Sequence, residues 1–150
     1  INMDIKAYFD GACAPINPGG TMSYGCVIII DVKEIRRWGK IYVPKKEILS
    51  TNNLAEYAGL LSLLLHLKKY NLTKENIEVF GDSQLVIKQM QGEWRIDGDK
   101  PYGYLGIKTA EIIQEFPNIK FKWIPREDNY SADALAESAL LQHGIKVRYY

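Results

Sequence analysis

The order of the expected elements constrains this chain most, because three alternating stretches come first and strands that alternate with helices follow. An apolar–polar period of two marks a strand. It predicts strands over Met3–Cys13, Tyr24–Asp31 and Ile35–Val43, and later strands over Ile77–Gly81 and Ile119–Ile124. A loop at 14–20 and a turn at Lys33-Glu34 join the first three strands. A meander followed by strand–helix units predicts an α/β fold with a five-stranded mixed sheet. Right-handed crossovers place strands one, four and five side by side in parallel, giving the order 3-2-1-4-5 with helices on both faces.

Four helices are expected among these strands. The first begins at a capping segment, Ser50–Asn53, and runs to Tyr70, and the second runs from Asp82-Ser83 to Gln91. The third runs from Tyr104 to Phe116, and the fourth is capped by Ser131 and runs to Gln142. Leucines at helical spacing over Leu60–Leu67 give the first helix an apolar stripe. Gly144 is expected to close the last helix. The alternating tail Ile145–Tyr150 predicts an extra strand, and Val27–Ile30 predicts a stretch buried on both faces of the sheet.

Composition narrows the class of protein. The chain has 150 residues, 47% of them hydrophobic and 25% charged, which fits one domain over residues 1–150 with its own core. No apolar run reaches the length of a membrane span, and no signal-peptide pattern opens the sequence. Cys13 and Cys26 lack the spacing of metal ligands and fit reduced thiols of a cytoplasmic protein. A disulfide, as found in the cytosol of some thermophiles, is the alternative that stays open. A net charge of +1 points to no particular partner.

Acidic residues stand at four places where strands end or helices begin. They are Asp10, Glu56, Asp82 and Asp133. An Asp-Gly turn explains Asp10 alone, and a capping box with Asn53 explains Glu56. A favourable interaction with the helix dipole explains Asp82 and Asp133. Glu56, however, falls on the apolar stripe of its helix, where a carboxylate requires a partner. Taken singly, these alternatives stay open.

All four acids map to one end of the predicted sheet, which favours a shared site over four coincidences. Clustered carboxylates repel one another, and divalent cations relieve that repulsion. Oxygen ligands with open positions suit Mg²⁺ or Mn²⁺ rather than zinc. Two such ions about 3.5–4 Å apart are a known arrangement for in-line displacement at a phosphodiester. The acids therefore predict a phosphodiester-cleaving site with two Mg²⁺ ions, or Mn²⁺ in their place.

The acids lie in four blocks of sequence. The blocks are Tyr8–Ala12 with Asn17–Gly20, Thr51–Glu56, Gly81–Val86 and Pro125–Asp133. Four such blocks in this order, each with its acid, resemble the ribonuclease H family, type 1, over nearly the whole chain. The resemblance implies the ribonuclease H-like fold and metal-dependent cleavage of the RNA strand of RNA/DNA hybrids, leaving 5′-phosphate and 3′-hydroxyl ends. It makes the four acids the catalytic residues and the metal ligands, with no nucleophilic side chain required.

The same resemblance implies a set of substrate contacts. The set comprises Asn17, Asn52 and Gln84 at 2′-hydroxyls and base edges in the minor groove, Thr51 and Asn53 at the DNA strand, and Arg126 and Asn129 of the last block. An amide offers both a donor and an acceptor, and the 2′-hydroxyl distinguishes RNA from DNA. Helix capping is the alternative explanation for the Thr51–Asn53 segment.

Two features depart from the family pattern. Many members carry a His in the loop before the last acid, whereas this chain has Arg126 there, which either holds a phosphate or pairs with Glu127 or Asp128 at the surface. His66 is expected to be structural, and His143 ends a helix. Where some members have a basic protrusion, residues 89–100 are short and weakly basic. Binding should then depend on the groove, with the tail and the basic residues at 33–46 as further contacts, unless the latter only guard an edge strand.

Two other functions compete with hybrid cleavage. A DNA-cutting, integrase-type nuclease also uses clustered acids, but Asn52 and Gln84 favour RNA. A non-catalytic nucleic-acid-binding module would be expected to lack at least one acid, and none is missing. The expected partner is an RNA/DNA hybrid, with duplex RNA left open, and the protein is expected to be a monomer without membrane contact.

Overall fold

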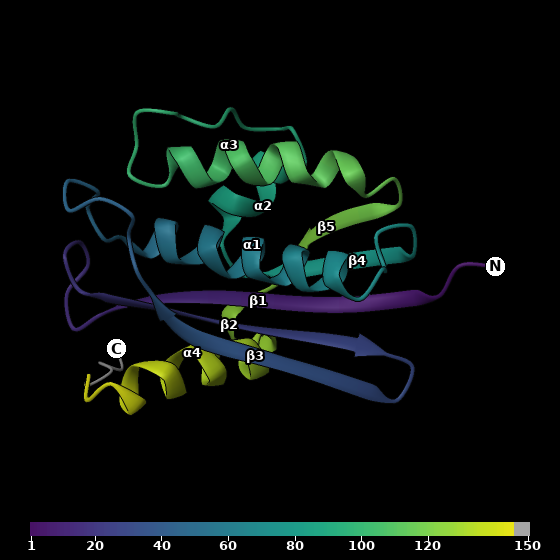
Figure 1. Ribbon diagram of the computed structural model, residues 1–150, viewed down its shortest axis with the longest axis horizontal. Coiled ribbons are helices and arrows are strands. Elements are labelled where there is room, and N and C mark those ends of the chain that lie inside the picture. The colour runs from purple at the N-terminus through teal and green to yellow at the C-terminus, as the bar shows by residue number, and fades with distance from the viewer. Residues whose placement is uncertain (146–150) are drawn as a thin grey trace.

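The computed structural model describes residues 1–145 and places five strands in one sheet of order β3-β2-β1-β4-β5. The strands are β1 (Asp4–Ala14), β2 (Thr21–Ile30), β3 (Lys33–Ile41), β4 (Asn76–Gly81) and β5 (Ile119–Trp123). β2 is antiparallel to β1 and β3, whereas β4 is parallel to β1 and β5. The predicted order is confirmed. Because β1, β4 and β5 are parallel, their C-terminal ends share one edge of the sheet, at the left of Figure 1.

Helices cover both faces of the sheet, as predicted (Figure 1). On one side lie α1 (Asn52–Lys69), α2 (Gln84–Met90) and α3 (Gly103–Ile112), and on the other side lies α4 (Tyr130–Gln142). Two short 3₁₀ helices, η1 (Ile113–Glu115) and η2 (Arg126–Asp128), follow α3 and precede α4. Within residues 1–145, no helix is both long enough and apolar enough to cross a bilayer.

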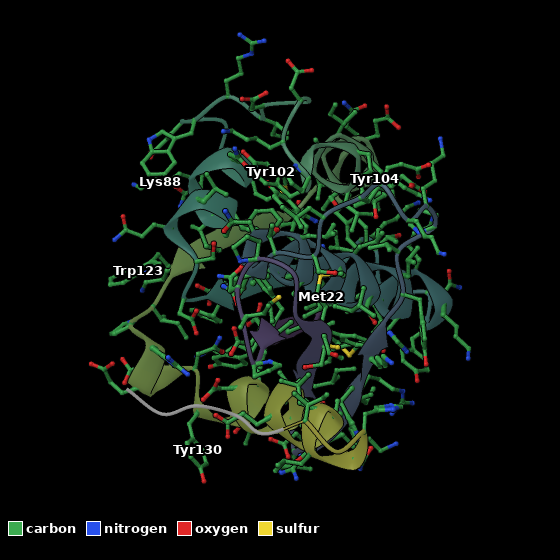
Figure 2. All side chains as sticks on the ribbon, turned by 90° about the vertical axis from the view of Figure 1, so that its left-hand side faces the viewer. Met22, Lys88, Tyr102, Tyr104, Trp123 and Tyr130 are labelled. Carbon is green, nitrogen blue, oxygen red and sulfur yellow. The ribbon has the colours of Figure 1, made fainter. Side chains whose placement is uncertain are left out.

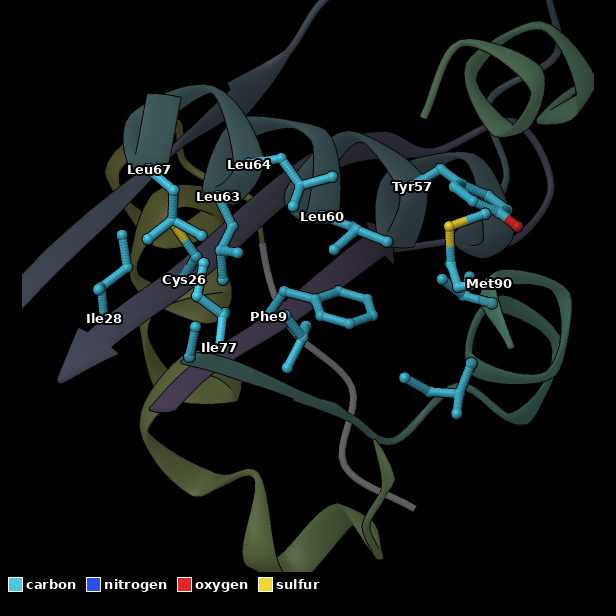
Figure 3. Close-up of a cluster of buried hydrophobic side chains, with 14 of the residues drawn as sticks. Phe9, Cys26, Ile28, Tyr57, Leu60, Leu63, Leu64, Leu67, Ile77 and Met90 are labelled. Atoms are coloured by element: carbon cyan, nitrogen blue, oxygen red, sulfur yellow. The ribbon is translucent and has the colours of Figure 1, made fainter. Parts of the chain in front are cut away.

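The core lies between α1 and the sheet (Figure 3). The leucine stripe of α1, from Leu60 to Leu67, is fully buried against Phe9 of β1, Ile28 of β2 and Ile77 of β4. Residues one helical turn apart share a face, so Glu56 lies on the same stripe one turn before Leu60. The packing that buries the leucines therefore also carries a carboxylate into the interior, over the end of β1.

Two details of the meander differ from the prediction. The chain reverses at Asp31-Val32 instead of Lys33-Glu34, because Asp31 adopts a φ of 54°, a left-handed conformation that short polar residues tolerate. Val27-Ile28 is fully buried, but Ile29-Ile30 is only half-buried. The end of β2 extends past α4 in Figure 1, so only one face of this stretch is covered.

The last helix begins earlier than predicted. Its N-cap position is Asn129, not Ser131, and no side chain caps it. Gly144 follows the helix with a φ of 74°, as expected for a C-terminal glycine. The predicted extra strand falls on the tail, of which residues 146–150 lie outside the described part of the chain.

Candidate active site

Three carboxylates meet at the C-terminal edge of the sheet, which faces the viewer in Figure 2. One oxygen from each of Asp10, Glu56 and Asp82 lies within 4.8 Å of the other two. Asp10 belongs to β1, Glu56 projects from α1, and Asp82 directly follows β4. Three segments that are far apart in the sequence thus deliver oxygen ligands to one point, as the sequence predicted.

The fourth acid, Asp133, stands in the first turn of α4 and borders the same cavity as the other three. The cavity has a volume of about 340 Å³, and Arg126 also lines it. The Arg126 guanidinium lies 3.6 Å from the Asp133 carboxylate. Of the two alternatives for Arg126, this contact counts against the surface pair with Glu127 or Asp128, because η2 turns the side chain toward α4.

Glu56 is 2% exposed and does not serve as a cap. Its Oε1 accepts a hydrogen bond from the Gly11 N–H at 3.2 Å, whereas Oε2 is buried without a partner. The N-terminus of α1 is capped by Thr51, whose Oγ1 accepts from the Leu54 N–H at 3.1 Å. A Cβ at Gly11 would collide with the α1 backbone, so glycine permits the close approach of β1 and α1. The capping-box explanation of Glu56 is wrong.

The carboxylates perturb one another strongly. Burial raises the pKa of Glu56 to about 8, and the charge of Asp82 adds to the rise. Burial, followed by the charge of Glu56, raises the pKa of Asp10 well above its usual range. Burial also raises the pKa of Asp82, against the hydrogen bond from Asn129. Around neutral pH the cation-free cluster thus holds protons that a divalent cation would displace.

Asn129 joins two parts of the site from within the protein. Its Nδ2 donates to the Phe9 carbonyl oxygen at 2.8 Å and to Asp82 Oδ2 at 3.0 Å, and its own Oδ1 is buried without a partner. At 1% exposure it has almost no surface to offer a substrate, which corrects its expected place among the substrate contacts. Its side chain orients Asp82, which also explains why it caps nothing at the start of α4.

The remaining predicted substrate contacts surround the cavity. Asn17 and Asn52 line it, and Asn17 Oδ1 accepts from the Asn52 N–H at 3.0 Å, which links the loop after β1 to α1. Asn53 and Gln84 are exposed in the first turns of α1 and α2. Thr51 uses its hydroxyl for capping, so the capping alternative holds for this residue.

Comparison with known proteins places this architecture in a family. A family model described as reverse transcriptase-like matches residues 23–139. Ribonuclease HI of Halobacterium salinarum is 34% identical over 136 residues, which cover 91% of this chain and 64% of that protein. The crystal structure of RNase H1 from Halobacterium salinarum gives a TM-score of 0.78 at 32% identity, covering 93% of this chain and 98% of that chain. The chain belongs to the reverse transcriptase-like family, and it is similar to the ribonuclease H proteins just described.

A second solved structure extends the comparison. LC11-RNase H1 in complex with an RNA/DNA hybrid gives a TM-score of 0.80 at 31% identity, covering 93% of this chain and 98% of that chain. The resemblance inferred from the four sequence blocks is thereby confirmed. The chain spans 64% of the length of the curated Halobacterium relative.

Among the described residues, no histidine lines the cavity. His66 lies within α1, where its Nδ1 is 2.7 Å from the Ser62 carbonyl oxygen, in agreement with a structural role. His143 follows the end of α4. Neither residue lines the cavity, where Arg126 stands in the loop before Asp133.

The structure adds two neighbours of the site that the sequence reasoning missed. Glu137 lines the cavity one helical turn after Asp133, and the spacing of four residues on α4 was the available indication. Trp123 donates its indole N–H to the Asp82 carbonyl oxygen at 3.0 Å. No local pattern predicts the second contact, because it joins β5 to the residue after β4.

Proposed function

We propose that this protein is a metal-dependent endoribonuclease that cleaves the RNA strand of RNA/DNA hybrids, leaving 5′-phosphate and 3′-hydroxyl ends. The convergence of Asp10, Glu56, Asp82 and Asp133 around one cavity carries the proposal. The cluster combines acids from β1, α1, the end of β4 and α4, and family membership supports the same activity.

The residues present fit Mg²⁺ as the cofactor, with Mn²⁺ as the alternative. The donors of the cluster are carboxylate oxygens, which hard divalent cations prefer. Glu56 Oε2 is buried without a hydrogen-bond partner, and coordination of a cation would satisfy this oxygen. The four acids would hold two ions. When bound, such ions activate water and neutralise the charge that develops on the phosphate and on the leaving oxygen.

The chain itself contributes geometry and charge to this chemistry. Gly11 holds Glu56 through its N–H, and Asn129 holds Asp82, so two of the ligands are oriented before a substrate arrives. Arg126, whose side chain is 68% exposed at the rim of the cavity, is placed to bind a phosphate of the substrate. No side chain is required as a nucleophile, because water serves in that role.

We assign recognition of the hybrid to side-chain amides that lie near the four acids. Asn17 and Asn52 border the cavity, and Gln84 is exposed two residues after Asp82. Amides can accept from or donate to 2′-hydroxyls and base edges across a wide minor groove. A hybrid is the substrate class that these groups favour, and the hybrid complex of LC11-RNase H1 supports the same assignment.

A panel of end-labelled duplexes tests the proposal. The purified protein is incubated with an RNA/DNA hybrid, duplex RNA or duplex DNA of one sequence, in Mg²⁺, in Mn²⁺ or in chelator. Cleavage of the hybrid with 5′-phosphate and 3′-hydroxyl ends, absent in chelator and absent from a folded Asp82→Asn variant, is the expected result. Preferential cutting of duplex DNA would favour the integrase-type alternative. Binding without cutting in either metal would favour the non-catalytic module.

The expected single domain, monomeric state and cytoplasmic location stay predictions. Sedimentation of the free protein and of its complex with hybrid measures the oligomeric state directly.

A further inference from the structure

Trp123, the last residue of β5, is an exposed aromatic side chain fixed beside the acids. It is 40% exposed, and its indole N–H donates to the Asp82 carbonyl oxygen at 3.0 Å. Figure 2, which faces the edge of the sheet where the acids meet, shows Trp123 at the rim of the molecule between Lys88 and Tyr130. A large apolar surface thus stands at the border of the site with its orientation already set.

The other two tryptophans provide an internal comparison. Trp38 and Trp94 are 43% and 47% exposed, close to Trp123. In the described part of the chain, neither of their indole N–H groups has a protein partner, so only the ring of Trp123 is anchored at this edge. An anchored ring loses little conformational freedom when a ligand covers it, which favours binding. Tryptophan is also a residue type enriched at sites that contribute strongly to binding.

We propose that the indole of Trp123 packs against the ribose of a nucleotide in the cleaved strand, adjacent to the phosphate held at Asp82. The inference rests on the proposed function, which places the scissile phosphate at the acids. Because Trp123 bonds to the main chain of Asp82, its ring is held next to a residue that would bind that phosphate through the cations. The ribose is the occupant because base faces are covered within a duplex, whereas sugars are displayed along the wide, shallow minor groove of an A-form helix.

The charges around the ring suit this occupant. Lys122, the preceding residue of β5, is exposed, and Arg126 is exposed three residues further along the chain. Neighbouring strand residues point to opposite faces of the sheet, so Lys122 lies on the face away from the ring, and Arg126 is the cation on the side of the cavity. A cation beside an apolar ring matches a sugar that is linked to a phosphate.

A purely structural role is the competing explanation, and two substitutions separate the alternatives. Trp123→Phe and Trp123→Ala both remove the N–H that holds the Asp82 carbonyl oxygen, but only the phenylalanine keeps an aromatic face. Contact with the ribose predicts that the alanine variant binds hybrid about fivefold more weakly or worse, while the phenylalanine variant stays within about twofold of the parent. Binding is measured with Mg²⁺ in an Asp133→Asn background that leaves the hybrid uncut, as checked on gels.

Intrinsic fluorescence supplies a readout independent of activity and of stability. A Trp38→Phe/Trp94→Phe protein retains Trp123 as its only tryptophan, and a Trp94→Phe/Trp123→Phe protein retains Trp38 as the matched control. Adding hybrid should change the emission of the Trp123-only protein, with a midpoint equal to the binding midpoint. The emission of the Trp38-only protein should change less, because Trp38 lies on β3, at the opposite edge of the sheet from β5.

The outcomes are distinct for the two proposals. Three results would each overturn the ribose contact and leave the proposed function standing. They are equal weakening of hybrid binding by the phenylalanine and alanine substitutions, no weakening of hybrid binding by alanine, and unchanged Trp123 emission at saturating hybrid. Failure of the parent protein to bind and cut hybrid would overturn both.

Discussion

Removing the charge of Glu56 should stabilise the cation-free protein in a pH-dependent manner. The substitution Glu56→Gln keeps the volume of the side chain and an oxygen that accepts from the Gly11 N–H, but it cannot ionise. The native carboxyl is 2% exposed and lies beside Asp10 and Asp82. Ionising it in the folded chain is therefore costly unless a cation is bound.

The size of the effect follows from the pKa of Glu56, which rises from an ordinary 4.5 to about 8 on folding. The folded state binds this proton more tightly than the unfolded state does. The contribution of protonated Glu56 to the unfolding free energy is therefore fully present below pH 4.5 and is lost as the pH rises through about 8. At about 1.36 kcal/mol per pKa unit, the parent loses about 3–4 kcal/mol of unfolding free energy through this group between pH 5 and pH 8. The glutamine variant lacks this loss, so its advantage over the parent should grow by that amount.

Urea denaturation in chelator at pH 5, 6, 7 and 8 measures the difference. Glu111→Gln, on the exposed side of α3, is the matched control and should follow the parent at every pH. Adding Mg²⁺ at pH 8 should stabilise the parent, by about 2.7 kcal/mol at 100 times the dissociation constant, and the glutamine variant by less. Parallel stability curves for the parent and Glu56→Gln would refute the argument that a buried, repelled carboxylate is held at this position.

Three further predictions concern the support of the site and its charge. Asn129→Ala should lower the unfolding free energy by about 1–3 kcal/mol, because the buried carbonyl oxygen of Phe9 loses its donor. The same substitution should slow Mg²⁺-dependent cleavage, because Asp82 loses its hydrogen bond. Unchanged cleavage kinetics would contradict the orienting role of Asn129. Gly25→Ala should cost about 1–3 kcal/mol, because its methyl group would collide with the Ala132 carbonyl oxygen of α4; Gly98→Ala, with ordinary contact distances, is the control in the same urea titration. Hybrid affinity between 50 and 200 mM salt should fall with a shallow slope, and a slope that requires about eight or more phosphate contacts would contradict the expected lack of a basic protrusion.

The fold was predictable because local periodicity and topology agree at every stage. Alternation in the first three strands, the leucine spacing of α1 and the right-handedness of the crossovers leave one arrangement of the sheet. The errors occurred where short-range chemistry is ambiguous. Asp31 and Lys33-Glu34 both suit a turn, and the choice depended on the backbone conformation that pairing of β2 with β3 imposes. Asn129 and Ser131 both suit a cap, and Asn129 occupies that position while its side chain is used in the core.

For the candidate site, the sequence alone determined the order of the elements, the four acids and the family they indicate, because each acid stands in a block whose spacing is readable along the chain. The roles of individual side chains depended on the tertiary structure. Glu56 accepts from Gly11 instead of capping its helix, Arg126 pairs with Asp133, and Trp123 bonds to the residue after β4. Each of these contacts joins segments that come together only when the sheet and its helices pack, and no pattern within one segment specifies which of several polar partners it will meet.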